Sequence, residues 1–164
     1  MHELSAHAAE VRKLWSNKSK PERERMIVRA FLRCVGVRFS EDEISSCMDD
    51  PPDVLFRDTR FEVMEDLEGR KRGDEWRERE QRWAKAERIA DLMEPYNASA
   101  PMPVTEAFPR SVEALASKAA KYGPGGCAQL DALVYLNLSG QHLWPLERPS
   151  DREAAQKAAA QGWR

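Results

Sequence analysis

The chain has 164 residues, 41% of them hydrophobic and 33% charged, a length and composition suited to one domain with a single core. Its 26 lysines and arginines nearly balance its 28 aspartates and glutamates, and the net charge of −2 gives no support for a dedicated non-specific DNA-binding protein, which is usually basic. Three widely spaced cysteines argue against zinc and disulfide partners, and the absence of a long apolar run argues against membrane insertion, so we expect a cytoplasmic protein.

Three helices are predicted in the first third of the chain. A first helix, expected to be an N-terminal extension over residues 1–18, is indicated by apolar side chains at helical spacing: Leu4, Ala8, Val11 and Trp15. A capping-box pattern that starts at Ser19 predicts a second helix, which ends near Gly36. The same pattern at Ser40 predicts a short third helix that ends before Pro51.

The spacing of apolar residues then changes to that of a strand. Apolar and polar residues alternate on either side of Asp58-Thr59, which predicts a β-hairpin with its turn there, and the apolar face is Val54, Phe56, Phe61 and Val63. In this register Asp53 lies opposite Met64. Because side chains alternate across a strand, Asp53 and Glu62 share the second face with Leu55 and Met64.

The remaining elements are a helix, a loop, a helix, a strand and an Ala-rich last helix. The first of these helices is predicted over Gly73 to Met93, the loop over the proline-rich residues 95–109, and the end of the next helix at Gly123-Pro124. The nearly continuous apolar run from Leu130 to Leu138 predicts a strand covered on both faces. We therefore expect a single α/β domain over residues 1–164, with a mixed sheet flanked by helices and a further C-terminal strand missing.

Two carboxylates converge on one side of the predicted hairpin. Asp53 and Glu62 would form a hard-oxygen site for Mg²⁺, an ion that takes one or two protein carboxylates and keeps several waters. Such an ion activates a water and stabilises the charge on a phosphodiester under attack. The alternative is a hairpin whose polar face is simply solvated, since Asp and Glu are common residues.

The segment PPDVLFRDTRFEVMEDLEGRKR, residues 51–72, resembles the PD…ExK signature of the PD-(D/E)XK nuclease superfamily. In detail it is similar to a bacterial family of unknown function described as putative endonucleases. The resemblance covers residues 20–164 in element order and is sharpest over residues 51–77. It implies a restriction-endonuclease-like fold and a hydrolase that cleaves DNA or RNA phosphodiesters with weakly bound Mg²⁺ or Mn²⁺.

The resemblance also implies roles for individual residues. Asp53 and Glu62 would be the metal-binding carboxylates, with the backbone carbonyl of Val63 as a third ligand. The lysine of the motif, which positions the attacking water, falls at residue 64, where this sequence has Met64. Lys71 is the nearest substitute, and if only the motif lysine is lost, Met64→Lys is expected to raise cleavage. The alternative is a catalytically degenerate nuclease-fold protein that binds nucleic acid or a protein partner.

A glutamate on a helix in front of the hairpin often completes such a site, and two residues compete for that place. Glu22 is explained by its position in the capping box that starts at Ser19. Glu24 lies at helical spacing from Ile27 and Phe31, which puts it on the inward face, where a carboxylate needs a partner or a metal. We assign Glu24 to the site; the alternative is a first-turn charge that favours the helix dipole.

Basic residues follow the hairpin. Arg70, Lys71 and Arg72 are predicted to contact nucleic-acid phosphates, and Arg77 and Arg79 would extend this surface. The alternative is a solvated helix whose charges form pairs one turn apart. The expected partners are thus DNA or RNA, and a homodimer is left open.

Overall fold

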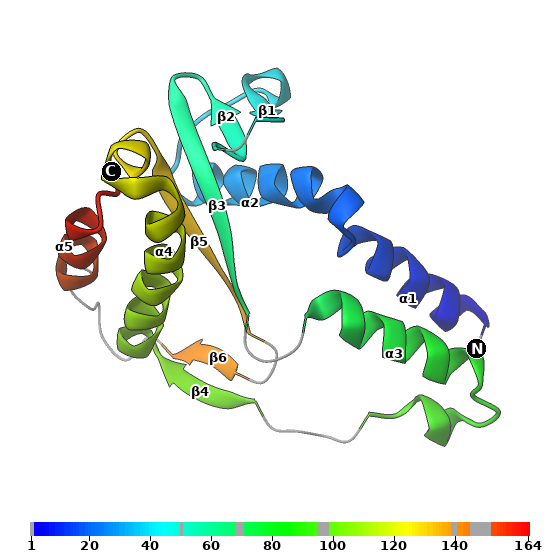
Figure 1. Cartoon of the computed structure of the whole chain (residues 1–164). Helices are drawn as coiled ribbons and strands as arrows, with labels where there is room; N and C mark the ends of the chain where they lie inside the picture. Colours follow the sequence, from blue (N-terminus) through cyan, green and yellow to red (C-terminus); the bar gives the residue numbers. More distant parts are fainter. Residues whose placement is uncertain (1, 50, 68–70, 95–98, 139–140, 145–151) are drawn as a thin grey trace. The chain divides into compact units, whose positions relative to one another are not determined.

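The computed structural model describes residues 2–49, 51–67, 71–94, 99–138, 141–144 and 152–164. Within them the helices and strands follow in the order α1 (His2–Leu14), η1 (Asn17–Ser19), α2 (Lys20–Cys34), η2 (Glu41–Glu43), β1 (Ile44–Ser46), β2 (Val54–Phe56), β3 (Thr59–Leu67), α3 (Arg72–Ala84), η3 (Ile89–Leu92), β4 (Ala100–Pro103), α4 (Val104–Cys127), β5 (Asp131–Asn137), β6 (Gln141–Trp144) and α5 (Arg152–Ala160), where η marks a 3₁₀ helix (Figure 1). None of the described helices is both long enough and apolar enough to cross a bilayer.

The chain divides into two compact units. The helical unit comprises residues 1–23 and 69–98, and the sheet unit comprises residues 24–68 and 99–164. In the helical unit, α1 and α3 pack side by side (Figure 1). The Trp76 ring makes edge contacts with the rings of His7 and Trp83, so these tryptophans belong to the packing between helices.

A four-stranded sheet with the order β1-β2-β3-β5 is the centre of the sheet unit. β1, β2 and β3 are antiparallel neighbours, while β5 runs parallel to β3 over its whole length (Figure 1). Parallel neighbours need a crossover connection, and α4 provides it. A separate two-stranded parallel sheet pairs β4 with β6. The expected mixed sheet flanked by helices is therefore confirmed.

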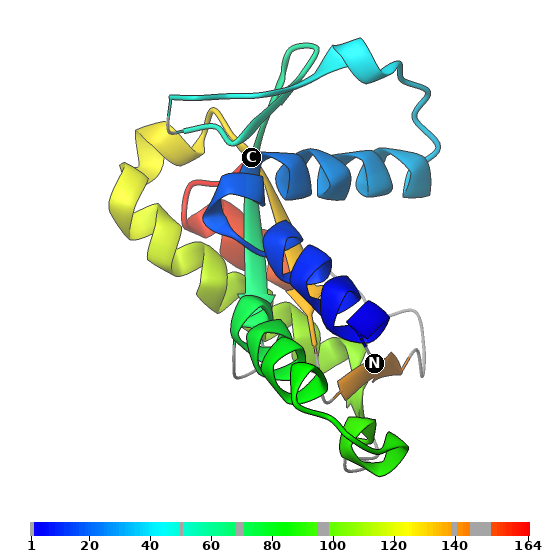
Figure 2. The ribbon, with the colours of Figure 1, turned by 90° about the vertical axis from the view of Figure 1, so that its right-hand side faces the viewer.

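Helices cover both faces of this sheet (Figure 2). One face packs against α2, and its buried core contains Val28, Leu32, Ile44, Val54, Phe56, Phe61 and Val63. The other face packs against α4 and the C-terminal segment through a second buried cluster, Met64, Leu115, Cys127, Leu130 and Trp163. The apolar face predicted for the hairpin is thus confirmed, and the face that carries Glu62 lies under α4.

The hairpin forms as predicted, but its predicted register is wrong by two residues. Val54 pairs with Phe61 and Phe56 with Thr59, so the turn is Arg57-Asp58. Arg57 has a positive φ of 52°, a conformation that two-residue hairpin turns require because it matches the twist of the strands. A shift of two residues leaves each side chain on its predicted face, since side chains alternate with a period of two.

Short strands replace a predicted helix at one position and part of a predicted loop at another. The capping box between Ser40 and Glu43 is present, but it closes one 3₁₀ turn, and the chain continues as β1 instead of a helix. The proline-rich segment contains β4 and then the start of α4, so the loop predicted over residues 95–109 is wrong from residue 100 onward. Pro103 directly precedes α4, a place that tolerates proline because the first four N–H groups of a helix have no partner within it.

The predicted stop at Gly123 appears as a kink in α4. Gly123 has φ 69° and ψ 168°, outside the helical region, and the helix resumes for one turn up to Cys127. This combination of angles is open almost only to glycine. The kink ends the straight part of α4 one residue after Tyr122.

Gly123→Ala is expected to lower the free energy of unfolding by about 1 to 3 kcal/mol, because a side chain strains this backbone conformation. Gly125→Ala is the matched control: Gly125 has no positive φ, and a Cβ there meets nothing within 4 Å. Its effect is expected to stay within about 0.5 kcal/mol. Urea unfolding measures both, and equal losses would contradict the role given to Gly123.

Candidate functional site

A buried carboxylate lies between the sheet and α4. Glu62 on β3 is 0% exposed, and its Oε1 accepts hydrogen bonds from two side chains of α4. Tyr122 donates its hydroxyl proton over 3.1 Å, and the Lys118 ammonium forms a short ion pair with the same oxygen. Lys118 Nζ also lies 3.3 Å from the Tyr122 hydroxyl oxygen. The three polar groups form one connected cluster.

The spacing of α4 explains why Lys118 reaches Glu62. Lys118 lies three residues after the buried Leu115 and four before Tyr122, on the face that α4 turns toward the sheet. Its side chain is 30% exposed, so the ammonium sits at the edge of the core above the carboxylate. Lysine can extend its apolar stem through such a layer while its charge stays near water. Our sequence reasoning did not select Lys118, although its place in the apolar stripe of this helix was a signal.

The second oxygen of Glu62 is unsatisfied. Glu62 Oε2 is buried and has no hydrogen-bond partner among the described residues. A buried carboxylate oxygen without a partner is costly, so a ligand or water at this position would stabilise the site. Burial, and then the Glu62 charge, raise the pKa of the neighbouring Cys127, which keeps this buried thiol neutral.

Asp53 lies at the edge of β3, just before β2. Its backbone N–H donates to the Phe61 carbonyl oxygen over 3.0 Å, and its Oδ2 accepts the backbone N–H of Val63 over 3.0 Å. Because β2 begins only at Val54, the Asp53 side chain takes the place of a strand partner for Val63. Val63 thus contacts Asp53 through its N–H, and its predicted carbonyl ligand role stays a prediction.

The predicted metal site is not complete in protein ligands. The described part of the chain contains no group of three or more histidines, cysteines, aspartates or glutamates that could hold a metal ion. Glu24 on α2 is buried at 7% exposure, as its inward position predicts, but it does not form such a group with Asp53 and Glu62. A cation bound by two carboxylates would need waters for its remaining positions.

The basic segment after the hairpin belongs to the helical unit. Arg70 lies outside the described residues, and Lys71 is exposed directly before α3. Arg72 pairs with Glu75 at 2.9 Å, and Arg77 pairs with Asp74 at 3.0 Å. The predicted role of Arg70, Lys71 and Arg72 in binding nucleic acid, and that of Lys71 as a catalytic lysine, stay predictions.

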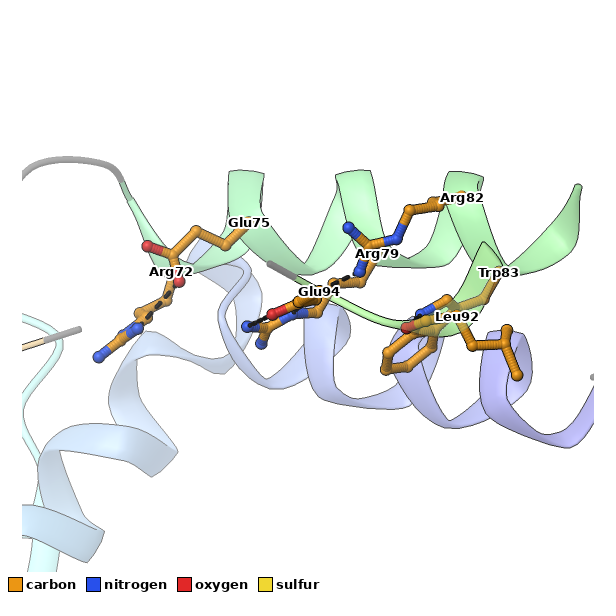
Figure 3. Close-up of polar contacts among 7 residues, drawn as sticks. All are labelled: Arg72, Glu75, Arg79, Arg82, Trp83, Leu92 and Glu94. Carbon is orange, nitrogen blue, oxygen red and sulfur yellow. Dashed lines mark hydrogen bonds and ion pairs between the residues drawn. The ribbon is translucent and has the colours of Figure 1, made fainter. Parts of the chain in front are cut away.

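Further along α3, two arginines share one carboxylate (Figure 3). Arg79 donates to both oxygens of Glu94, at 2.6 and 3.0 Å, and Arg82 donates to one of them at 2.6 Å. The Arg79 guanidinium, assisted by that of Arg82, holds the pKa of Glu94 at about 2. Arg79 also lies over the Trp76 ring, 4.6 Å from its centroid. The structure therefore favours the alternative of a solvated helix whose charges are paired.

Residue 64 does not belong to the polar cluster. Met64 is 6% exposed and packs into the apolar cluster of α4 and the C-terminal segment. An ammonium at residue 64 would have to enter this cluster. Lys118 brings an ammonium to Glu62 from α4 instead. The interpretation that only a lysine at residue 64 or Lys71 could supply that charge is therefore incomplete.

Comparison with known proteins places the chain in a family. A family model described as "Putative endonuclease, protein of unknown function (DUF1780)" matches residues 1–164. The chain belongs to this family. A solved protein of unknown function from Pseudomonas aeruginosa strain PAO1, described as a member of the monooxygenase superfamily, has a similar fold. Its TM-score is 0.63 at 24% identity, over 98% of this chain and 73% of that one, a likeness that concerns the fold alone. No curated protein gives a significant match.

Loss of Lys118 is expected to destabilise this family member because it leaves the Glu62 carboxylate buried and uncompensated. Lys118→Met should lower the free energy of unfolding by about 2 kcal/mol or more, a value reduced for the partial exposure of Lys118. With Glu62→Gln already present, the same change should cost at least about 1.5 kcal/mol less. Lys157→Met on α5, where the lysine is exposed and pairs with Glu153, is the control and should add to Glu62→Gln within about 0.5 kcal/mol. Additive effects of the Lys118 and Glu62 changes in urea unfolding would show that the pair is not coupled.

Met64→Lys is expected to lower the free energy of unfolding by about 3 kcal/mol or more, because it places a charge in an apolar cluster. Met64→Leu keeps the volume and should cost less than about 1.5 kcal/mol. Thermal and urea unfolding of the two variants compare the effects directly. Equal stability of the two would mean that an ammonium at residue 64 reaches the free oxygen of Glu62.

Proposed function

We propose that the chain is a metal-dependent, endonuclease-like hydrolase that acts on nucleic-acid phosphodiesters. One observation carries the proposal: the ion pair between Glu62 and Lys118. It joins a carboxylate of the PD…ExK-like segment to an ammonium from α4. A nuclease site of this type needs both charges, and residue 64 supplies no ammonium.

The topology of the sheet unit supports the same proposal. The resemblance to the PD-(D/E)XK superfamily implies a hairpin, a helix and a further strand in a mixed sheet with helices on its faces. β2, β3, α4 and β5 occur in that order along the chain, with α3, η3 and β4 between β3 and α4, and β5 is parallel to β3. The description of the family as putative endonucleases points in the same direction.

The residues present fit a weakly bound divalent cation. Glu62 Oε2 is a buried acceptor without a partner, and a carboxylate oxygen is the type of ligand that Mg²⁺ and Mn²⁺ prefer. Asp53 would supply the second carboxylate, whereas α2, which carries Glu24, covers the face of the sheet opposite to Glu62. When bound, the cation would supply an activated water and neutralise phosphate charge.

Lys118 and Tyr122 take the positioning role that the motif lysine has in the superfamily. The ammonium of Lys118 is held by Glu62 Oε1 and the Tyr122 hydroxyl, so its position is fixed before substrate arrives. A fixed positive charge stabilises charge that develops on a phosphate without further reorganisation. Its partial exposure lets it meet a substrate from the solvent side.

A second candidate function is a nuclease-fold protein that binds nucleic acid or a protein partner without cleaving. The burial of Glu62 favours it, because its charge is already compensated by Lys118 and a cation would have to enter a closed position. In this case the cluster serves to hold α4 on the sheet. The two candidates differ in whether divalent metal changes a nucleic-acid substrate.

Metal-dependent cleavage decides between them. Wild type is expected to cleave plasmid, single-stranded DNA or RNA with Mg²⁺ or Mn²⁺, and Asp53→Asn, Glu62→Gln and Lys118→Gln should each lower the rate about a hundredfold or more. Lys157→Gln is the control and should keep the wild-type rate, since Lys157 is an exposed lysine of α5 that pairs with Glu153. Circular dichroism and melting curves confirm that each variant is folded.

Other results have definite meanings. Loss of activity in Lys71→Gln but not in Lys118→Gln would move the lysine role to Lys71. A wild type that binds nucleic acid and is inert with both metals on every substrate would support the second candidate. Equal binding of Mg²⁺ by wild type and Asp53→Asn in calorimetry would place the cation elsewhere.

A further inference from the structure

Arg60 lies on the same sheet face as the two carboxylates. It is on β3, paired with Leu55 of β2 and two residues before Glu62. Because side chains alternate along a strand, Arg60, Glu62 and Met64 point to the same side of the sheet. Residues two apart on a strand are neighbours on that face, so the Arg60 side chain starts beside the Glu62 cluster.

The guanidinium of Arg60 has few partners. Arg60 is half-buried, and its Nε is buried without a hydrogen-bond partner among the described residues. Its Nη2 donates to the Pro51 carbonyl oxygen over 3.4 Å, a bond near the limit of useful length. This contact draws the side chain toward the segment that carries Asp53. Within the described parts of the chain, no carboxylate pairs with it.

Most of the other described arginines of the sheet unit have a carboxylate partner or are exposed; Arg25 is half-buried as well, and its Nη1 donates to Ser46 Oγ over 3.3 Å. Carboxylate partners are present for Arg29 with Glu41, Arg57 with Glu43, Arg110 with Asp66 and Arg164 with Asp131. Arg33, Arg38 and Arg152 are exposed, so water solvates their charge. Arg60 combines partial burial with no acidic partner among the residues that the structure describes, an arrangement that is costly without an anion.

We propose that Arg60 binds a phosphate oxygen of a nucleic-acid strand and positions the phosphodiester beside Glu62 and Lys118. The proposal rests on the proposed function and names a residue that holds its substrate. A guanidinium is planar, always charged and carries five donors, which suits two oxygens of one phosphate. A phosphate bound there also supplies the missing acceptor for the buried Nε.

Binding measured without divalent metal tests Arg60 separately from cleavage. Fluorescence anisotropy in EDTA, with labelled single-stranded DNA, duplex DNA and RNA, gives affinities at several salt concentrations. Arg60→Gln is expected to weaken the best-bound of these at least about tenfold and to reduce the salt dependence by about one phosphate contact. Arg60→Lys keeps the charge and should recover part of the loss, which a purely structural role would not explain.

Arg57→Gln is the matched control. Arg57 is at the turn of the same hairpin, is exposed and pairs with Glu43, so its loss removes the same charge without touching the site. Equal affinities of Arg60→Gln and Arg57→Gln would overturn the proposal, as would a wild type that binds none of the three nucleic acids. A melting temperature of Arg60→Gln near that of wild type shows that lost binding is not lost folding.

The outcomes separate this inference from the proposed function. Weakened binding in Arg60→Gln together with no cleavage by wild type would support Arg60 and reject the hydrolase. Metal-dependent cleavage that needs Glu62, with unchanged affinity and KM in Arg60→Gln, would support the hydrolase and reject Arg60.

Discussion

The ion pair between Glu62 and Lys118 constrains how α4 lies on the sheet. A fully buried carboxylate must have a compensating charge, and here that charge comes from a residue 56 positions later in the chain. Tyr122, one turn further along α4, donates to the same oxygen. Any shift of α4 along β3 would separate these groups. The position of the helix is therefore set by a polar contact as well as by apolar packing.

A second ion pair near the other end of α4 reinforces this constraint. Arg110 Nη2 lies 3.0 Å from Asp66 Oδ1, and Asp66 follows Glu62 by four residues on the same face of β3. Four residues of a strand span about 13 Å, and the eight residues from Arg110 to Lys118 span about 12 Å of helix. The two spacings agree. Met64 and the apolar residues of α4 lie between the two pairs, so strand and helix are matched at both ends and in the middle.

Such buried pairs are not, in general, a source of stability. The cost of removing two charges from water often equals their attraction, and an apolar pair of the same volume would frequently serve as well. The Glu62 cluster leaves one carboxylate oxygen without a partner among the described residues, and so does the Asp66 carboxylate below Arg110. A cluster built only for stability would not be expected to leave this atom unsatisfied. This excess of acceptors over donors is the physical reason to regard the cluster as a site.

Much of the fold could be predicted from local patterns, and the site could not. The two faces of the hairpin were predicted from the alternation of apolar and polar residues alone. They were predicted correctly although the register was wrong, because a register error of two residues leaves every side chain on the same face. The register itself depended on a turn at Arg57-Asp58 that begins with a positive φ at Arg57, a conformation that no local pattern indicates for an arginine. β1 and β4 are three and four residues long, too short for a period to appear. Lys118 was missed because its partner, Glu62, lies on β3, and only the packing of α4 against β3 brings the two residues together.

The distribution of paired and unpaired charge limits where a nucleic acid could bind. On α3 the arginines that suggested a phosphate-binding surface neutralise carboxylates of their own unit, such as Glu75 and Glu94. Each of these ion pairs would have to break before its arginine could bind a phosphate. The loss of the ion pair would cancel most of the binding free energy that the phosphate contact provides. On the sheet, no carboxylate of the described residues pairs with Arg60, and Lys118 shares a carboxylate oxygen with Tyr122 while it reaches the solvent. With a net charge of −2, the protein has little general attraction for a polyanion, so recognition would depend on a few such groups near Glu62. Weak, local binding at that face is consistent with a protein that acts on a phosphodiester and does not coat a nucleic acid.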